Sequence, residues 1–193
     1  MPSYLVFDVR LLGVPNPPWR RIMLRSTLSF QALHVAIQDA CGWEDNHLHL
    51  FRDVDDPSAQ VCGSPFFEEK TSPNTSRVKL RSVFKQPGDV LLYEYDFGDG
   101  WEHEVKLIEI FEDRATFERR LIGGEQAFPP EDCGGIPGYL ECIRVTTGSI
   151  SLEVGAVPNP NATPQGDEEL RDWLGSWTPT RFHLRIAMKN FER

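Results

Sequence analysis

Alternation of hydrophobic and polar positions predicts the β-strands of this chain. The predicted strands are residues 4–12, 19–24, 47–51, 78–83, 90–97 and 101–110. The turn Pro15-Asn16-Pro17-Pro18 separates the first two, which we expect to pair antiparallel. Asp99-Gly100 lies between the last two and is a strong signal for a β-hairpin.

Apolar positions at a spacing of three and four residues predict the helices. We expect helices over residues 29–41 and 136–147, a short one from Gly166, and a last one from Thr178-Pro179. Residues 123–138 and 148–166 are expected to be loops, the second one variable. The predicted fold is α+β: an antiparallel sheet with a long β-hairpin, packed against several helices in a single domain over residues 1–193.

The last predicted helix carries an apolar stripe and a basic one. The basic stripe consists of Arg181, Arg185 and Lys189. Such a stripe is either a solvated face or a docking surface for acidic residues of the hairpin, and exposed charges at this spacing favour the solvated face.

The hairpin residues Tyr93 to Glu104 hold four aromatics, five carboxylates and a histidine. A two-residue loop would place Asp96 opposite His103, whereas a three-residue loop would pair Tyr95 with His103 and Phe97 with Trp101. The hydrophobic pattern favours the three-residue loop, which buries His103 on the aromatic face. The other face then sets like charges opposite each other, which needs a covering cation or basic cluster.

Composition and charge narrow the class of protein. The net charge is −9, and residues 88–113 alone contain nine acidic residues against one lysine. Non-specific nucleic-acid binding is therefore not expected. The chain has no apolar run of membrane-spanning length, and Met1-Pro2-Ser3-Tyr4 does not resemble a signal peptide, so we expect a cytoplasmic protein without membrane contact. Cys41, Cys62, Cys133 and Cys142 lack Cys-x-x-Cys spacing and are expected to be free thiols.

Several separated segments resemble one known family. They are Pro18-Trp19-Arg20-Arg21-Ile22, Leu33-His34, Ile37-Gln38, Gly42-Trp43, residues 47–51, residues 93–103, residues 129–135 and Gly138-Tyr139. Together they resemble the plasmid pRiA4b ORF-3-like family over about residues 3–145, with a weaker echo in the last helix. The chain departs from the pattern at Trp177-Thr178-Pro179, where an acidic Asp-Pro pair would be expected.

The resemblance implies a protein of plasmids or mobile elements without an established activity. Some members carry a resolvase-type label. A serine recombinase needs a nucleophilic serine supported by arginines, and this acidic chain shows no basic helix-turn-helix.

The candidate metal ligands are Asp96, Asp99, His103 and Glu131, because carboxylates with one imidazole suit Zn, Mn or Mg. The competing and favoured interpretation makes Asp99 a turn former and His103 a packed core residue. His47 and His49 lie two residues apart on one strand face, so they either reach one metal together or, as favoured, are structural or exposed residues. His34 is expected to be a packing residue.

A candidate binding surface combines the hairpin with other polar segments. Its residues are Trp19, Arg20, His47, His49, Trp101, Asp132 and Cys133. Trp19 and Arg20 form either an anion-binding feature or, as favoured, a core tryptophan and a salt bridge to the acidic hairpin. Residues 129–135 form either a binding loop brought to the hairpin, with Cys133 as ligand or nucleophile, or a rigid covering loop.

These observations favour a non-enzymatic binding or accessory protein with an unknown protein partner. The chain shows no phosphate-binding glycine loop, nucleophile elbow or His-Glu-x-x-His motif. The alternatives are a metal-dependent hydrolase that uses the acidic hairpin, and a DNA-recombination accessory protein.

Overall fold

The computed structural model describes residues 1–56, 58–64, 73–148 and 163–191. The strands are β1 Ser3–Leu11, β2 Trp19–Arg25, β3 His49–Asp53, β4 Gln60–Gly63, β5 Val90–Tyr95, β6 Trp101–Glu112 and β7 Arg119–Glu125. The helices are α1 Phe30–Cys41, α2 Leu80–Val83, α3 Gly135–Thr147, α4 Pro164–Leu174 and α5 Leu184–Phe191. None of the described helices combines the length and the apolar character needed to cross a bilayer.

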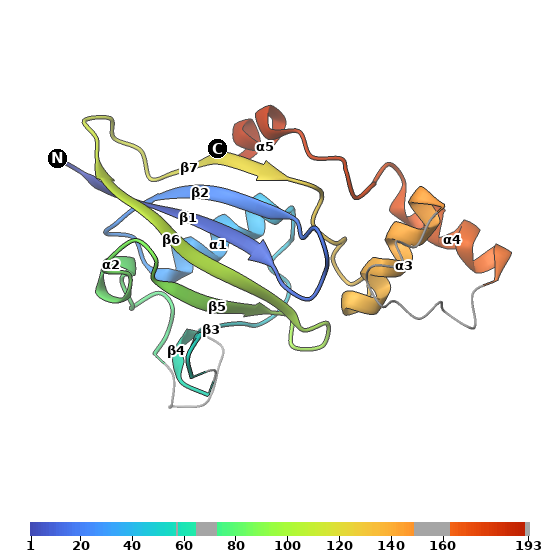
Figure 1. Cartoon of the computed structure of the whole chain (residues 1–193), viewed down its shortest axis with the longest axis horizontal. Helices are drawn as coiled ribbons and strands as arrows, with labels where there is room; N and C mark the ends of the chain where they lie inside the picture. The colour runs from blue at the N-terminus through green and yellow to red at the C-terminus, as the bar shows by residue number, and fades with distance from the viewer. Residues whose placement is uncertain (57, 65–72, 149–162, 192–193) are drawn as a thin grey trace.

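The seven strands form one antiparallel sheet in the order β4-β3-β5-β6-β1-β2-β7, which confirms the α+β prediction. Helix α1 covers one face of this sheet, while α3 and α4 lie together beyond one end of the strands (Figure 1). Helix α5 packs along β7 and contacts α1. The basic stripe of α5 therefore does not dock on the hairpin.

Helix α1 is built as its sequence predicts. The Ser29 hydroxyl accepts a hydrogen bond from the Ala32 amide at the start, and Gly42 adopts the left-handed conformation (φ 83°) that ends the helix. Leu33, Ala36 and Ile37 are fully buried against the sheet. The same face also carries His34, which is likewise fully buried.

The hairpin register differs from both predicted ones. Tyr95 pairs with Trp101 and Tyr93 pairs with His103, so residues 96–100 form a five-residue loop. The predicted aromatic face is correct because the register keeps the same alternation, except that Phe97 leaves the sheet and is 42% exposed. Asp96 leaves the strand because it adopts a left-handed conformation (φ 53°).

The like charges on the outer hairpin face are Glu94 and Glu102, which pair directly. A covering cation was expected for this face, and the structure shows that it is Arg52 of β3. The Arg52 guanidinium lies 2.7 Å from both carboxylates. One arginine from a neighbouring strand therefore balances the two acids.

Other boundaries correct the predictions. Residues 80–83 are a helical turn rather than a strand, β4 and β7 were not predicted, and α5 starts at Leu184 rather than at Thr178-Pro179. β7 does not show clear alternation, because it is an edge strand with Gly123-Gly124 just before its last residue, Glu125. The predicted variable loop over residues 148–166 lies largely outside the described residues, and α4 already begins at Pro164 behind a Thr163 cap.

Candidate functional site

Three segments meet beyond the end of the sheet: residues 43–48, the hairpin loop 96–100 and residues 126–134. The Trp43 indole donates to the Pro129 carbonyl at 2.9 Å. Glu131 accepts from the Glu44 amide at 2.6 Å and from the Tyr95 hydroxyl. The Gly134 amide donates to the Asp99 carboxylate at 3.1 Å. The Pro-Pro-Glu-Asp-Cys-Gly-Gly loop is thus held against the hairpin, and we call this region the loop junction.

Two glycines allow the close approach of these backbones. A Cβ on Gly135 would lie 2.6 Å from the Asp99 carbonyl oxygen, and one on Gly138 would lie 1.6 Å from the Cys133 carbonyl oxygen. Gly135 also has a positive φ of 67°. Both positions therefore require glycine.

Each segment of the loop junction contributes one aspartate with left-handed backbone. These are Asp45 (φ 58°), Asp96 (φ 53°) and Asp132 (φ 58°), three of the five non-glycine residues with positive φ in the described part of the chain. Such conformations are uncommon outside glycine, although aspartate tolerates them better than most residues. Each of the three carboxylates lies beside a histidine.

His34 belongs to a closed ring of hydrogen bonds. Its Nε2 lies 2.7 Å from Asp45 Oδ1, and its Nδ1 lies 2.8 Å from the Tyr93 hydroxyl. Gln38 donates to that hydroxyl at 3.0 Å and accepts from the Asp45 amide at 3.1 Å. A carboxylate can only accept, so His34 carries its proton on Nε2 and Tyr93 donates to Nδ1.

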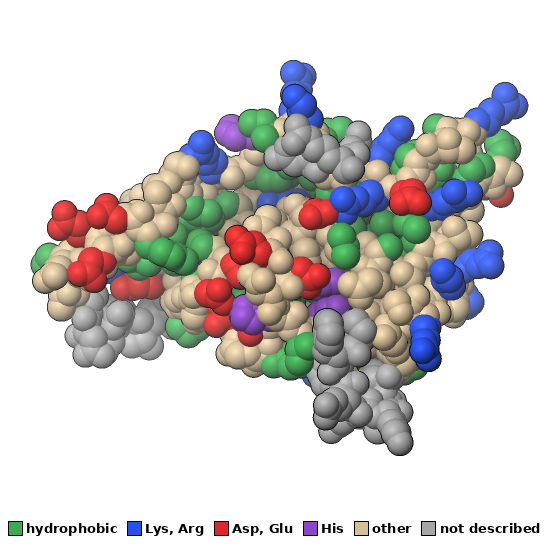
Figure 2. All heavy atoms as spheres, turned by 180° about the vertical axis from the view of Figure 1, so that it is seen from behind, with side chains coloured by type: hydrophobic (Ala, Val, Ile, Leu, Met, Phe, Trp, Pro, Cys, Tyr) green, Lys and Arg blue, Asp and Glu red, His purple; other side chains and the backbone are tan. Residues whose placement is uncertain are grey.

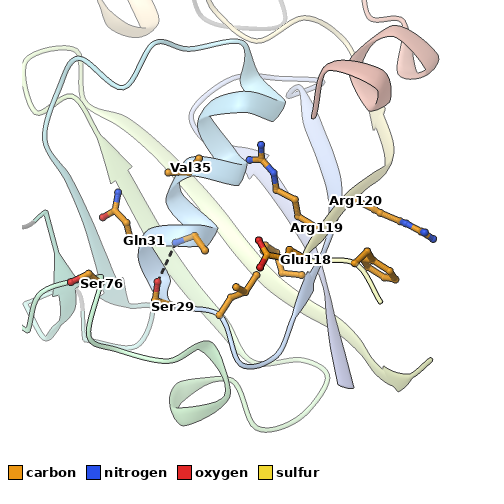
Figure 3. Close-up of a pocket in the computed structure, with 11 residues that line it drawn as sticks. Ser29, Gln31, Val35, Ser76, Glu118, Arg119 and Arg120 are labelled. Atoms are coloured by element: carbon orange, nitrogen blue, oxygen red, sulfur yellow. Dashed lines mark hydrogen bonds between the residues drawn. The ribbon is translucent and has the colours of Figure 1, made fainter. Parts of the chain in front are cut away.

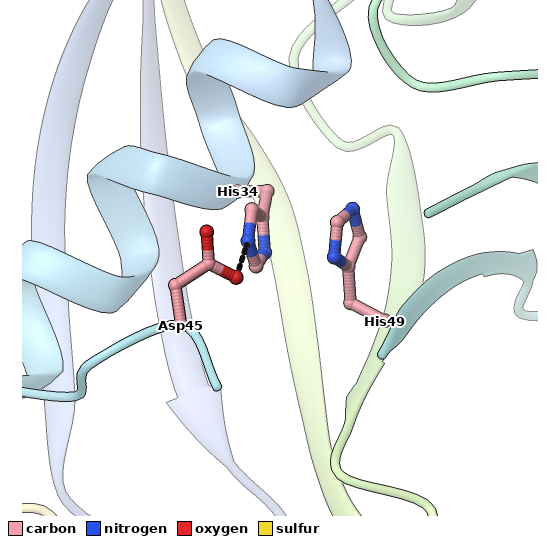
Figure 4. Close-up of side chains that lie close together, drawn as sticks. All are labelled: His34, Asp45 and His49. Atoms are coloured by element: carbon pink, nitrogen blue, oxygen red, sulfur yellow. Dashed lines mark hydrogen bonds and ion pairs between the residues drawn. The ribbon is translucent and has the colours of Figure 1, made fainter. Parts of the chain in front are cut away.

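His49 stacks on this histidine, and its ring makes no hydrogen bond to the described residues (Figure 4). The two rings are 3.5 Å apart and nearly parallel, at 13°. His49 is 2% exposed, and neither ring nitrogen has a hydrogen-bond partner within the described residues. Burial lowers the pKa of both His34 and His49 to about 3, so both rings are neutral at pH 7.

His47 forms a second group with aspartates of the other two segments. Its Nε2 lies 2.9 Å from Asp132 Oδ1, and its Nδ1 lies 3.7 Å from Asp96 Oδ1. A pocket of about 320 Å³ is lined by both His47 and His49, together with Asp45. Acidic side chains gather around histidines on this face of the molecule (Figure 2).

The structure thus places His47 and His49 in different groups, so the less favoured alternative of one metal shared by these two histidines does not fit. The groups whose possible ligand atoms lie within 4.8 Å of one another, in the part of the chain that the structure describes, are His34-Asp45-His49 and His47-Asp96-Asp132. The alternation rule places two strand residues on one face, but β3 begins only at His49, so His47 does not follow it.

The predicted ligand set of Asp96, Asp99, His103 and Glu131 is likewise divided. His103 is fully buried, stacks on Phe128, and has its Nδ1 3.3 Å from the Tyr93 carbonyl oxygen. Burial lowers its pKa to about 4. Asp99 and Glu131 bind backbone amides of the loop junction, so only Asp96 joins a histidine group.

The other predicted surface residues take different places. Trp101 is a core residue, 1% exposed. Arg20 makes no salt bridge to the hairpin and instead donates to backbone carbonyl oxygens, while Trp19 is half-buried beside Glu125. Cys133 packs against Cys142, and the hydrogen bond between the two thiols raises the pKa of Cys133, so Cys133 is no ready nucleophile.

Sequence reasoning missed His34 and Asp45 as site residues. His34 lies on the buried face of α1, where a histidine is expected to be a packing residue. Asp45 lies in a short connection after the helix. The contact with His49 depends on how α1 crosses β3, for which the sequence carries no local signal.

A cavity of about 760 Å³ lies elsewhere, between α1 and the start of β7. It is lined by Ser29, Gln31 and Val35 on the helix side and by Glu118, Arg119 and Arg120 on the other, with the Arg120 side chain pointing away from the helix (Figure 3). Its lining includes no histidine or cysteine, so the histidine groups remain the better candidate site.

Comparison with known proteins places the chain in a family. Residues 3–185 match the family of plasmid pRiA4b ORF-3-like proteins, so the chain belongs to that family. The uncharacterized protein y4hQ of Sinorhizobium fredii (strain NBRC 101917 / NGR234) is 37% identical over 124 residues, which are 63% of this chain and 62% of that protein. The chain thus matches less than two thirds of that relative's length.

One solved structure resembles the whole fold. The crystal structure of MM3350, a protein of unknown function from Methanosarcina mazei Go1, aligns with a TM-score of 0.76 at 27% identity. The alignment covers 96% of this chain and 98% of that one.

Proposed function

We propose that this member of the plasmid pRiA4b ORF-3-like family is a non-enzymatic binding or accessory protein that holds a divalent transition metal at His34, Asp45 and His49. The observation that carries the proposal is the unpaired state of His49. Its two ring nitrogens are buried and have no hydrogen-bond partner within the described residues. Leaving a buried polar atom unpaired costs about 1–3 kcal/mol, so the site gains free energy from a ligand that engages the ring.

The donor set selects the kind of metal. Two neutral imidazoles with one carboxylate suit Zn, Co or Ni, whereas Mg prefers oxygen ligands. Mn is intermediate. The low pKa of both histidines keeps each ring neutral at pH 7, so a metal does not have to displace the second proton of an imidazolium.

Binding requires a local rearrangement of the rings. A metal lies close to the plane of each imidazole that binds it, and stacked rings 3.5 Å apart do not meet this condition. No hydrogen bond to the described residues holds the His49 ring, so the ring can turn without breaking one. To hold a metal there, His34 would carry its proton on Nδ1 and donate it to the Tyr93 hydroxyl, which would free Nε2 and the Asp45 carboxylate to be the other two ligands.

A second candidate function, metal-dependent hydrolysis, is favoured by one observation. The pocket of about 320 Å³ beside His49 also reaches His47, which leaves room for water and a small substrate next to the metal. A catalytic metal needs such an open coordination position. Turnover of ester or phosphate substrates by the metal-loaded protein, lost in His49→Gln, would favour this candidate over the first.

The partner, compartment and genetic context of the protein are part of the proposal. Leu48 and Phe97, 38% and 42% exposed, offer apolar contact area at the loop junction for a partner protein. The four cysteines are free thiols, which fits the cytoplasm. A role on plasmids or mobile elements is suggested by the family description alone.

Titration of the chelator-treated protein with Zn, Co, Mn and Mg tests the metal site. We expect one zinc or cobalt ion per chain by calorimetry and a raised melting temperature, with little response to magnesium. His49→Gln should weaken binding at least about tenfold, which corresponds to about 1.4 kcal/mol. The matched variant His47→Gln alters the neighbouring group and should bind as the wild type does.

Three results would count against the proposal. If none of these metals gives a calorimetric signal, the proposed metal site does not exist. Equal affinity of His49→Gln and wild type would move it away from His49. Loss of binding in His47→Gln but not in His49→Gln would transfer it to the exposed group.

A further inference from the structure

Arg20 is a buried cation without a carboxylate partner. It lies on β2, is 3% exposed, and makes no ion pair with the described residues. Its Nε donates to the Ala40 carbonyl at 2.8 Å, and its Nη1 donates to the carbonyls of Trp19 at 2.8 Å and Glu125 at 2.9 Å. These contacts join the end of α1 to β2 and β7, but they supply no full negative charge.

The remaining nitrogen, Nη2, has no hydrogen-bond partner within the described residues. Aromatic rings flank the guanidinium, because its central carbon lies 3.7 Å from the centre of the Phe182 ring and 4.8 Å from that of Phe128. An acceptor can therefore reach the group only at its edge. Among the guanidinium nitrogens, Nη2 is therefore the one that the described residues leave without an acceptor.

A cavity of about 420 Å³ is lined by Arg20, and we call it the Arg20 pocket. Its walls are largely apolar and include Phe128, Trp177, Phe182 and Ala187. The cationic Arg181 also lines it, whereas the carboxylate in its lining, Asp39, is engaged by Arg119. The pocket is thus positive in a protein whose net charge is −9.

The charge of Arg20 persists under physiological conditions. Burial lowers the pKa of its guanidinium, but only to about 10, which is still well above neutral pH. A buried charge without a counterion is costly, and an anion that enters the pocket relieves that cost.

We propose that the Arg20 pocket binds a small organic carboxylate, with one carboxylate oxygen at Nη2 of Arg20 and an apolar body against Phe182 and Trp177. The volume falls within the range of small-molecule sites, about 300–1,000 Å³. A carboxylate fits better than a phosphate, because one open nitrogen in an apolar pocket balances a single charge rather than two.

This site is independent of the proposed metal site. The Arg20 pocket and the pocket beside His47 and His49 share no lining residue. The protein would thus carry two binding sites, and failure of one leaves the other standing.

Ligand titration followed by tryptophan fluorescence and calorimetry tests the proposal. The probes are phenylacetate and hexanoate, with phenylacetamide as the neutral match and inorganic phosphate as the competing anion. We expect a dissociation constant below about 1 mM for at least one carboxylate, and at least tenfold weaker binding of phenylacetamide and phosphate.

Two variants locate the binding. Arg20→Met removes the charge and should weaken binding at least tenfold. Because Arg20 also joins three elements, Ala187→Phe provides a second variant that fills the pocket and leaves the arginine in place. Arg185→Gln, on the same helix and outside the lining, is the matched control and should bind as the wild type does.

Several results would overturn the proposal. They are the absence of carboxylate binding at millimolar concentration, equal binding of phenylacetate and its amide, tighter binding of phosphate, and undiminished binding by Ala187→Phe. None of these four results depends on Arg20→Met, so the test holds even if that variant fails to fold.

Discussion

Replacing His49 by phenylalanine is expected to stabilise the metal-free protein, although His49 is among its most deeply buried polar residues. The substitution removes two buried ring nitrogens without hydrogen-bond partners and keeps a flat ring stacked on His34. Each such nitrogen costs about 1–3 kcal/mol, and the larger ring costs about 1–3 kcal/mol through crowding. At the low end of each range, about 2 kcal/mol for the two nitrogens and about 1 kcal/mol for crowding, the expected net gain in unfolding free energy is about 1 kcal/mol near pH 7.5.

The gain should grow in acid. A histidine with its ordinary pKa of about 6.5 takes up a proton in the unfolded chain well before the folded protein, where burial lowers the pKa of His49 to about 3. The unfolded state therefore binds more protons between these values, and stability is lost as the pH falls through this window. At pH 5 the loss is about 2 kcal/mol for His49, which the variant avoids. The difference between variant and wild type should thus reach about 3 kcal/mol.

Urea denaturation in the presence of a chelator measures both effects, provided that the slope with denaturant stays unchanged. His34→Phe is the matched control, because His34 is buried equally and has an equally low pKa but is hydrogen-bonded to Asp45 and Tyr93. That variant should lose about 2–3 kcal/mol near neutral pH. The reasoning is refuted if His49→Phe is the less stable protein at neutral pH, or if its advantage does not widen in acid.

Three further predictions concern the frame around the site. Gly138→Ala should cost at least about 3 kcal/mol or prevent folding, since the new Cβ would lie 1.6 Å from the Cys133 carbonyl oxygen; a melting temperature within a few degrees of wild type would contradict this. Arg52→Gln should cost about 1 kcal/mol by leaving Glu94 opposite Glu102 without a cation, and adding Glu102→Gln should restore most of the loss. Tyr95→Phe should cost about 1–3 kcal/mol and expose residues 129–135 to hydrogen exchange, because its hydroxyl holds Glu131; unchanged protection would show that the loop junction does not depend on it.

Much of the sheet could be read from alternation alone. The aromatic face of the hairpin, the strand pair β1 and β2, and the capped helix α1 follow from local patterns, because a period of two or of 3.6 residues directly reports which face is buried. The loop length between β5 and β6 did not follow. Alternation is the same for a three-residue and a five-residue loop, so it could not tell where Asp96 leaves the strand.

The candidate site shows the same division. The sequence by itself determined the family, the acidic hairpin, the Gly-bounded loop of residues 129–135 and the presence of histidines at positions 34, 47 and 49. Only the tertiary structure decided that His49 stacks on His34, that His47 turns to the aspartates of two other segments, and that Arg20 is buried among carbonyl groups. The physical reason is that local patterns specify which face of an element is buried. The groups that meet there are set by the packing of elements distant in sequence, and this packing leaves both ring nitrogens of His49 and Nη2 of Arg20 without a hydrogen-bond partner among the described residues.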